Sequence, residues 1–364
     1  MNRIRNIHQL LGNAGPGNSI SAGARLLRDA LREWGYGSEL YAETVAPASS
    51  WGEVRHFRHY HPNPADALIL HYTQASAISD YARALRCPLI LVYHNVTPAY
   101  FFAGVNPDVM ATTQRGLAEL ATFREQTLLA VADSAYNGRD LLEAGFAQTV
   151  VVPILIPETL LQTQPDPGGM AALADGINLL CVGRVAPNKR YEDVIKVLYY
   201  YRQIEPAARL FLVGHTEYTG PYVAWLREFV AWLRLDDAVT FTGHVSEAAL
   251  AAYYRRAAAF VYMSEHEGFG VPLVESMRFG VPVVAYAGAA VPETLGGAGI
   301  LLREKHFPVV AETLYLLQTD AELRAQVVER QYARAQDFAP ATILRLFREK
   351  IEDAVRAFEN KSRT

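Results

Sequence analysis

Short apolar runs, several of them ending in a polar residue, recur through the first half of the chain. Such runs are typical of strands that are buried on both faces of a parallel sheet. They are residues 4–11, 67–71, 88–94, 128–134 and 150–156. After the first run comes a glycine-rich loop and then an amphipathic pattern that predicts a helix over residues 20–34.

The alternation of strand and helix patterns stops and then begins again. Prolines and glycines are densest in residues 157–169, which favours an interdomain linker there. Beyond it, strand patterns cover residues 177–183, 209–214, 238–243, 257–264, 281–287 and 299–302, with helix patterns between the first five and a turn over 289–293 before the last. This rhythm predicts a second doubly wound domain.

The predicted fold class is therefore α/β, with two Rossmann-like domains. We expect the first domain over residues 1–157 and the second over residues 158–340. The last helix, over about residues 341–364, has no strand to pair with in the second domain. We expect it to pack back onto the first domain.

Composition and charge narrow the class of protein. The chain has 364 residues, 51% of them hydrophobic and 20% charged, which suits two globular domains. It has neither an apolar run of the ~20 residues that a membrane helix needs nor an apolar signal core near its start. The net charge of −4 gives no reason to expect nucleic acid as a partner.

The cysteines and the metal-binding residue types add little chemistry. Cys87 and Cys181 each lie in or beside a strand pattern, and we expect both to be reduced. No cluster of metal-ligand type is evident, so no metal site is predicted. These features favour a cytoplasmic protein and leave contact with the inner membrane surface and the oligomeric state open.

The stretch SEHEGFGVPLVE, residues 264–275, is the first candidate site. It is predicted as strand, loop and helix start, so the amides of four residues and the helix dipole would face a ligand: Gly268, Phe269, Gly270 and Val271. Glu267 and Glu275 would repel phosphate there and accept hydrogen bonds from hydroxyl groups. A nucleotide sugar carries phosphates and hydroxyls together. Alternatively, Glu267 caps its turn and Glu275 is a solvated helix residue.

The second candidate site follows the first strand of the second domain. Residues 183–190 place Arg184 and Lys189 at the carboxyl end of that strand. Arginine offers a planar fork to phosphate oxygens and lysine a point charge, so the pair suits a diphosphate. The alternative is that both are solvated loop cations.

A glycine-rich loop, residues 12–19, follows the first strand of the first domain. Gly15 and Gly17 would let the backbone approach a ligand, and Asn18 or Ser19 can cap the helix that follows. The spacing departs from the dinucleotide fingerprint, so a nicotinamide or flavin cofactor is not expected. A plain tight turn remains the alternative.

Polar residues also end the central strands of the first domain, where open α/β sheets bind ligands. These residues are His71, His94, Asn95, Asp133 and Ser134. We regard His94 as the strongest candidate for catalysis, and His71, Asn95 and Ser134 as weaker candidates for binding an acceptor.

Together these motifs resemble the retaining glycosyltransferases of the GT-B fold, family 4, also called glycosyl transferases group 1. The resemblance covers most of the chain and is strongest over residues 177–302. It rests on VGRVAPNKR, FTGHVS, EGFGVPLVE, SMRFGVPVVA and the pair Pro292-Glu293. It implies two domains facing each other across a cleft.

The resemblance also implies roles for individual residues. Arg184 and Lys189 would hold the donor diphosphate, and Glu275 the ribose. Glu267 would hold the donor sugar together with the amides of Phe269, Gly270 and Val271. The base would lie near the loops that contain Val213, Gly214, Gly243 and His244. His94 looks like the family's sugar-contacting histidine, although Asn95 follows it where the family often has an acidic residue.

The expected activity is transfer of a hexose from a UDP- or GDP-linked sugar to an acceptor hydroxyl, with retention of configuration and without a metal or cofactor. The acceptor could be a glycan, a lipid-linked sugar or a small molecule. A phosphorylase on the same scaffold and a non-catalytic nucleotide-sugar-binding protein are the alternatives.

Overall fold

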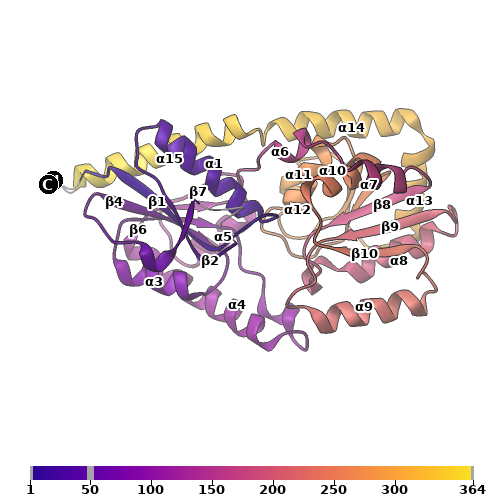
Figure 1. Ribbon diagram of the computed structural model, residues 1–364, viewed down its shortest axis with the longest axis horizontal. Coiled ribbons are helices and arrows are strands. Elements are labelled where there is room, and N and C mark those ends of the chain that lie inside the picture. The colour runs from indigo at the N-terminus through magenta and orange to yellow at the C-terminus, as the bar shows by residue number, and fades with distance from the viewer. Residues whose placement is uncertain (1–2, 47–52, 362–364) are drawn as a thin grey trace. The chain divides into compact units, whose positions relative to one another are not determined.

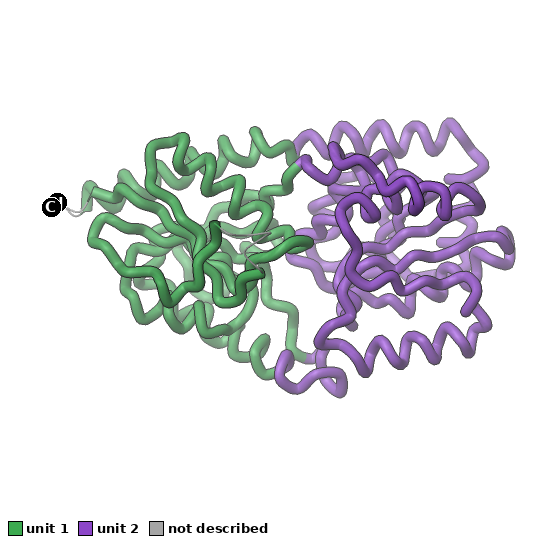
Figure 2. The backbone as a smooth tube through the Cα atoms, viewed as in Figure 1, with its two compact units in different colours: residues 1–99, 111–157, 338–364 green, residues 100–110, 158–337 purple. Residues whose placement is uncertain are grey.

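The computed structural model describes residues 3–46 and 53–361. The chain forms two compact units (Figure 2). Unit 1 contains residues 1–99, 111–157 and 338–364, and unit 2 contains residues 100–110 and 158–337.

Unit 1 is built on a seven-stranded sheet with the order β3-β2-β1-β4-β5-β6-β7, in which every pair of neighbours is parallel (Figure 1). The strands are β1 (Asn6–Ala14), β2 (Leu40–Val45), β3 (Val54–His56), β4 (Asp66–Tyr72), β5 (Leu89–Tyr93), β6 (Thr127–Ala132) and β7 (Thr149–Val151). The apolar runs predicted β1, β4, β5, β6 and β7. They missed β2 and β3, which are short, partly polar and at one side of the sheet.

Two boundaries in unit 1 differ from the prediction. Strand β1 continues through Gly12 to Ala14, so the loop that follows is only residues 15–18. Strand β7 stops at Val151, although Val152 and Leu155 are also buried. Pro153 lacks an N–H and cannot donate to a ladder, which explains why the buried run does not continue as a strand.

Helices cover both faces of the unit 1 sheet. They are α1 (Ser19–Glu33), α3 (Ala77–Leu85), α4 (Pro107–Glu119), α5 (Ala135–Glu143) and α15 (Pro340–Lys361). Leu27 of α1 shares one apolar cluster with Phe347 and Ile351 of α15. Ile78 of α3 and Leu141 of α5 belong to the cluster on the opposite face. The last helix is thus part of the core of unit 1.

Unit 2 repeats the same topology with six parallel strands in the order β10-β9-β8-β11-β12-β13. The strands are β8 (Ile177–Val182), β9 (Ala208–Val213), β10 (Val239–Gly243), β11 (Ala259–Tyr262), β12 (Val283–Tyr286) and β13 (Ile300–Leu302). All six were predicted, with boundaries that differ by a few residues.

The helices of unit 2 include two within the predicted linker, α6 (Thr159–Gln162) and α7 (Pro167–Ala172). The others are α8 (Tyr191–Tyr201), α9 (Gly220–Trp232), α10 (Glu247–Arg256), α11 (Val271–Arg278), α12 (Val291–Leu295), α13 (Phe307–Thr319) and α14 (Ala321–Gln336). The predicted turn over residues 289–293 is instead the start of α12. Pro292 is at the beginning of that helix, where its missing N–H costs nothing. In the described parts of the chain, no helix is long and apolar enough to cross a membrane.

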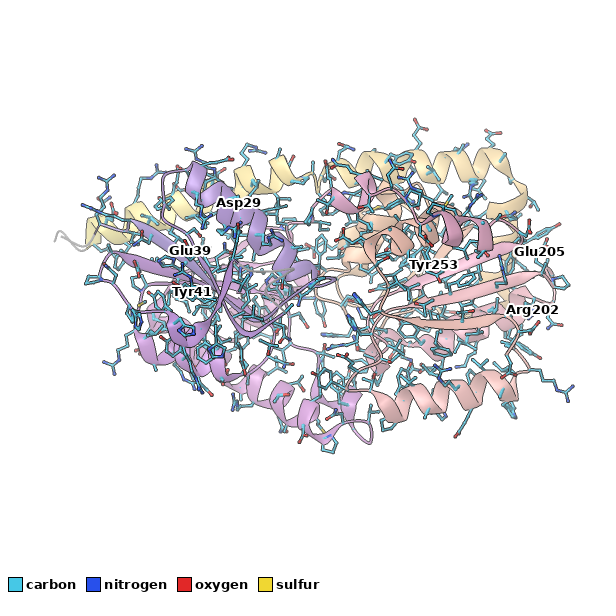
Figure 3. The ribbon with its side chains drawn as sticks, in the orientation of Figure 1. Asp29, Glu39, Tyr41, Arg202, Glu205 and Tyr253 are labelled. Carbon is cyan, nitrogen blue, oxygen red and sulfur yellow. The ribbon has the colours of Figure 1, made fainter. Side chains whose placement is uncertain are left out.

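The strand order fixes where each sheet can bind a ligand. The order reverses direction between β1 and β4 in unit 1 and between β8 and β11 in unit 2. At such a point the connections leave on opposite faces, and the loops beyond the carboxyl ends of the strands part to leave a crevice. Arg202 and Glu205, labelled in Figure 3, lie in the turn between α8 and β9. This turn is at the amino end of β9, opposite the carboxyl edge of the sheet.

The packing of α15 predicts a stability effect. Ile351 is fully buried in the cluster that contains Ile7 and Ile69. Ile351→Ala should lower the free energy of unfolding by about 2 to 5 kcal/mol, because it removes buried methyl groups and leaves a cavity. Glu349→Ala, a change to an exposed carboxylate two residues earlier, should change it by about 0.5 kcal/mol or less. Urea unfolding measures both. Equal midpoints for the two variants would contradict this packing.

Candidate functional site

A buried asparagine joins the two loops at the switch point of unit 2. Asn188, in the loop after β8, donates from Nδ2 to the carbonyl of His266 at 3.0 Å. The backbone carbonyl of Asn188 accepts from the amide of Glu265 at 2.9 Å and from Oγ of Ser264 at 3.0 Å. These bonds fix the loop after β11 against the loop after β8. Sequence reasoning missed Asn188, because an asparagine in a loop gives no signal of burial.

The Lys189 ammonium and the Glu267 carboxylate form an ion pair at this point. Glu267 is only 7% exposed, and its Oε1 also accepts from the Tyr262 hydroxyl at 2.5 Å. Lys189 Nζ lies 3.1 Å from the same hydroxyl. Burial and the neighbouring Glu267 raise the pKa of Tyr262 well above its usual value, so the phenol stays a hydrogen-bond donor. Sequence reasoning found Lys189 and Glu267 but treated Tyr262 as an ordinary strand residue.

Arg184 differs from Lys189 in having no partner. Its side chain is exposed, and within the described ranges neither an ion pair nor a hydrogen bond holds its guanidinium. The Glu267 carboxylate lies close enough to act on the charge of this guanidinium. An arginine at the carboxyl end of a central strand, near a carboxylate but not bound to it, is available for an anionic ligand.

Glu275 is held in the same way as Glu267. It lies on α11, is half-buried, and its Oε2 accepts from the Tyr254 hydroxyl of α10 at 2.7 Å. Burial raises the pKa of Glu275, and the bond from Tyr254 opposes that rise. Glu275 is therefore a held carboxylate and not a solvated helix residue. Tyr254 was also missed from the sequence.

The turn between these two glutamates requires glycine. Gly270 precedes α11 with a φ of 93°, in the left-handed region that side chains disfavour. The carbonyl of Phe269 accepts from the Thr294 hydroxyl of α12 at 2.5 Å. The turn through Gly268 and Phe269 is thereby anchored, and the amide of Val271 begins the helix.

A cluster of charged side chains holds the loop after β11 in place. The buried Asp193 accepts from Lys305 and Lys196 at 2.8 and 2.9 Å. Lys305 also binds Glu265 at 2.8 Å, and Arg190 lies 3.4 Å from both Glu265 and Asp193. The bonds from Lys305 and Lys196 outweigh desolvation and lower the pKa of Asp193. The cluster therefore ties the loop to α8 and to the chain after β13.

The ends of β9 and β10 form a second part of this edge. His215 and His244 stack with ring centroids 4.3 Å apart. Desolvation and His215 lower the pKa of His244, which keeps its imidazole neutral near pH 7. Gly214, after Val213, has a φ of 150°, and a Cβ there would lie 2.0 Å from the carbonyl of Gly183. Gly214 also donates to the carbonyl of Gly243 at 3.0 Å.

In unit 1, a chain of hydrogen bonds links four strands. Gln9 Nε2 donates to the carbonyl of Ala24 at 2.9 Å, which leaves its Oε1 to accept from His71 Nε2 at 2.9 Å. Burial lowers the pKa of His71 well below its usual value, so its Nδ1 is unprotonated and accepts from His94 Nε2 at 2.9 Å. His94 Nδ1 faces Asp133 Oδ2 at 2.7 Å.

The hydrogen-bond pattern indicates which nitrogens of His94 face a proton. His94 Nε2 must carry one, and a second lies between His94 Nδ1 and Asp133. Both nitrogens of His94 are occupied within unit 1, and its side chain is 5% exposed. Sequence reasoning brought His71, His94 and Asp133 to one edge, and it missed Gln9.

The other predicted site residues of unit 1 make local contacts that stabilise the loops and the start of α5. Asn95 has a φ of 79°, a conformation that asparagine tolerates, and its side chain bonds to Asn137 and Asp140 at 3.0 and 3.3 Å. The buried Ser134 accepts from the amide of Asn137 and caps α5. Gly15 and Gly17 lie in the short loop after β1, where Gly17 has a φ of 73°.

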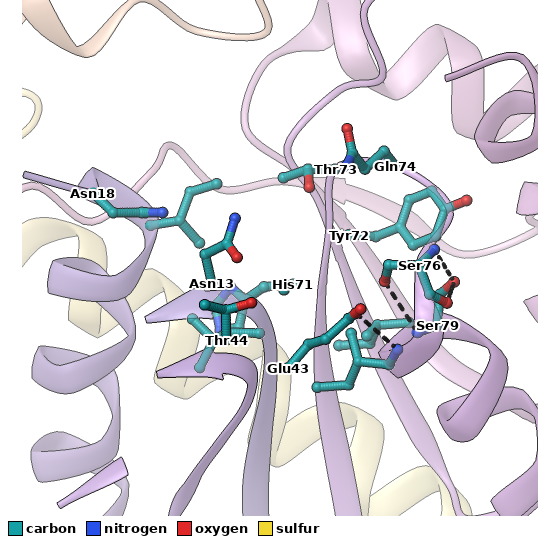
Figure 4. Close-up of a pocket in the computed structure, with 15 residues that line it drawn as sticks. Asn13, Asn18, Glu43, Thr44, His71, Tyr72, Thr73, Gln74, Ser76 and Ser79 are labelled. Atoms are coloured by element: carbon teal, nitrogen blue, oxygen red, sulfur yellow. Dashed lines mark hydrogen bonds between the residues drawn. The ribbon is translucent and has the colours of Figure 1, made fainter. Parts of the chain in front are cut away.

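A pocket of about 150 Å³ opens at the switch point of unit 1 (Figure 4). Strands β1, β2 and β4 and the start of α3 line it, and its wall includes Asn13, Glu43, Thr44 and Thr73. His71 also borders the pocket. No group of three metal-ligating side chains occurs in the part of the chain that the structure describes.

The fold and the comparisons define the class of protein. The chain has the GT-B fold, as predicted: it superposes with a TM-score of 0.76 on the Anabaena protein Alr3699/HepE, solved with UDP and glucose. That structure is 17% identical, and the match covers 96% of this chain and 100% of the other.

The predicted likeness to group 1 is confirmed for most of unit 2. Residues 172–334 match the family model described as glycosyl transferases group 1. A D-inositol 3-phosphate glycosyltransferase of Kineococcus radiotolerans is 28% identical over 83% of this chain and 74% of its own length. A GDP-mannose-dependent phosphatidylinositol monomannoside mannosyltransferase of Mycobacterium tuberculosis is 27% identical over 48% of each chain. This chain spans between a quarter and a half of the length of several curated relatives.

The burial of His266 predicts a pH effect on stability. Desolvation lowers the pKa of this imidazole from 6.5 to about 4. Between these pH values the unfolded chain binds a proton that the folded chain does not, so the free energy of unfolding falls as the pH is lowered from about 6.5 to about 4. The loss from this group is at most about 3 kcal/mol. His266→Gln should have the smaller loss over that window in urea unfolding. Parallel pH profiles for the two proteins would contradict it.

Proposed function

We propose that the protein is a glycosyltransferase that moves a hexose from a nucleotide diphosphate sugar to an acceptor hydroxyl. The observation that carries the proposal is the set of groups at the switch point of unit 2. One unpartnered cation, Arg184, lies at the same edge as two glutamates, Glu267 and Glu275, that are each held through one oxygen. The match of residues 172–334 to group 1 supports it.

Arg184 and Lys189 would hold the diphosphate. Arg184 can present its planar guanidinium to two phosphate oxygens at once. Lys189 already contacts Glu267 and Tyr262, and its third N–H is left for a phosphate oxygen. Two cations at this edge can balance the charge that develops on the leaving group, which is why the proposal needs no metal ion.

The two glutamates would bind hydroxyl groups. Tyr262 and Lys189 both bind Oε1 of Glu267, and Tyr254 binds Oε2 of Glu275. The second oxygen of each carboxylate has no partner among the described residues. Such an oxygen is a strong acceptor with a fixed position. We assign Glu267 to the donor sugar and Glu275 to the ribose, and we place the base near Gly214 and His244.

The proposed reaction retains the anomeric configuration. The acceptor oxygen attacks the anomeric carbon on the face that the diphosphate leaves, the bond from that carbon to the phosphate oxygen breaks, and a phosphate oxygen takes the acceptor proton. In this scheme Glu267 positions the sugar and is not the nucleophile, because the acceptor oxygen itself attacks the anomeric carbon. Unit 1 would bind the acceptor.

A contact between His94 and the donor sugar requires a change in the hydrogen bonds of His94. For His94 Nε2 to donate to an oxygen of the donor sugar, it must give up its bond to His71. Asp133 would keep the second nitrogen occupied and the ring oriented. The proposed contact with the sugar therefore involves an exchange of hydrogen-bond partners within unit 1.

Replacing the unpartnered cation tests the diphosphate site. Arg184→Ala should lower kcat/KM with UDP- or GDP-linked hexoses by about a hundredfold to a thousandfold, because it removes a preorganised charge worth about 3 to 4 kcal/mol in the transition state. Arg330→Ala, which removes an exposed arginine of α14, is the matched control and should retain activity. Turnover is followed by release of the nucleoside diphosphate. Unchanged turnover in Arg184→Ala would refute the assignment.

Glu267→Gln separates the sugar from the nucleotide. The variant keeps the shape of the side chain but weakens its bonds to a sugar hydroxyl and releases Lys189. Affinity for the nucleotide sugar should fall by about tenfold or more, whereas affinity for the free nucleoside diphosphate should stay the same or rise. Isothermal calorimetry with UDP, GDP and their hexose conjugates measures both. An equal loss of affinity for the nucleotide sugar and for the free nucleoside diphosphate would contradict the assignment of Glu267 to the sugar.

A further inference from the structure

The pocket of unit 1 has an electrostatic character that bears on the acceptor, provided that the proposed function holds. Figure 4 shows Asn13, Thr44 and Glu43 along the β1–β2 side, with Tyr72 and Ser76 on the other side. No lysine or arginine lines it in the described part of the chain.

Among the described residues that line the pocket, the one acidic side chain is Glu43, and its carboxylate binds the start of α3. Its Oε2 accepts from the amide of Ile78, in the first turn of α3, at 3.2 Å. Ser76 and Ser79 complete a capping box at the same end. At the start of α3, the amides of Ser76, Ile78 and Ser79 are therefore already bound by the protein's own carboxylate and hydroxyl groups.

The nearest arginines on α3 and α4 are also committed. Arg83 binds Asp80 at 2.5 Å and lies 3.5 Å from the buried Glu119. Arg115 lies 3.3 Å from Asp80 and 3.5 Å from Glu119. Two carboxylates thus balance the two guanidinium groups. His71 adds no charge, because burial lowers its pKa and keeps it neutral.

What the pocket does offer is a set of neutral groups that both donate and accept. The side chains of Asn13, Thr44, Thr73 and Gln74 have no hydrogen-bond partner among the described residues. Oε1 of Glu43 is in the same position, since only Oε2 is used by α3. Hydroxyl groups also donate and accept, whereas a phosphate dianion only accepts and is repelled by a carboxylate.

We propose that this pocket binds the acceptor through an uncharged polyol: a sugar or cyclitol unit that carries no phosphate where it contacts unit 1. Glu43 accepts from one of its hydroxyls, and the amides and threonines bind the others. Glu43 selects against phosphorylated acceptors by its charge and by filling the start of α3.

Matched pairs of probes test the proposal. The probes are glucose, fructose and myo-inositol, each beside its own monophosphate, at millimolar concentration with the full chain and saturating UDP or GDP. Saturation-transfer NMR measures binding. Wild type should bind the neutral member of at least one pair in preference to its phosphate. Glu43→Gln keeps an acceptor for the Ile78 amide and should reduce or abolish that preference, weakening the neutral sugar by about tenfold.

The control variant is Glu39→Gln. Glu39 lies just before β2, at the opposite end of the strand from the pocket, and pairs with Arg32 at 3.1 Å (Figure 3). It should bind the probes as the wild type does. Preferred binding of a phosphate, absence of binding by all neutral probes, or an equal effect of Glu39→Gln and Glu43→Gln would each overturn the proposal. Failure of the proposed function would be seen separately, because UDP- or GDP-linked hexoses would then release no nucleoside diphosphate, whichever probes bind.

Discussion

The ion pair between Lys189 and Glu267 is the interaction on which the candidate site of unit 2 depends. Lys189 follows β8 and Glu267 follows β11, and the parallel pairing of those strands brings the two loops together. A carboxylate that is only 7% exposed needs a partner, since an unpaired buried charge is strongly destabilising. The same contact holds the two loops together and leaves the other oxygen of Glu267 without a partner among the described residues.

Further contacts hold the two loops in place around this pair. Asn188 ties the backbone of one loop to the other, and Tyr262 gives Glu267 a second donor from beneath. Behind the loop, Lys305 bridges Glu265 and Asp193. Each of these contacts restricts a main-chain or side-chain rotation before a ligand arrives. A site that is preorganised in this way loses less entropy when it binds.

The sequence predicted the architecture well because the signal is periodic. Buried parallel strands read as apolar runs, and both sheets were anticipated apart from β2 and β3, where LYAETV and VRH are too short and polar to stand out. The candidate loops were also found, since glycine, proline and charge at strand ends follow from general rules. Predicting the site beyond that point failed for a physical reason. Tyr254 and Tyr262 lie in a helix and a strand. Their hydroxyls become site groups only through contacts with Glu275 and Glu267, which belong to the next helix and the next loop.

His94, at the end of a strand, also shows what could not be predicted from the sequence. The sequence placed His71, His94 and Asp133 at one edge of the sheet. It did not predict the hydrogen bonds among them or the part of Gln9, because these depend on how side chains from different strands meet. The two switch points also differ in chemistry. Unit 2 gathers cations beside carboxylates with one open oxygen, and unit 1 gathers amides and hydroxyls around a single carboxylate. The two sheets share one topology, so this difference in chemistry comes from the side chains that follow the strands.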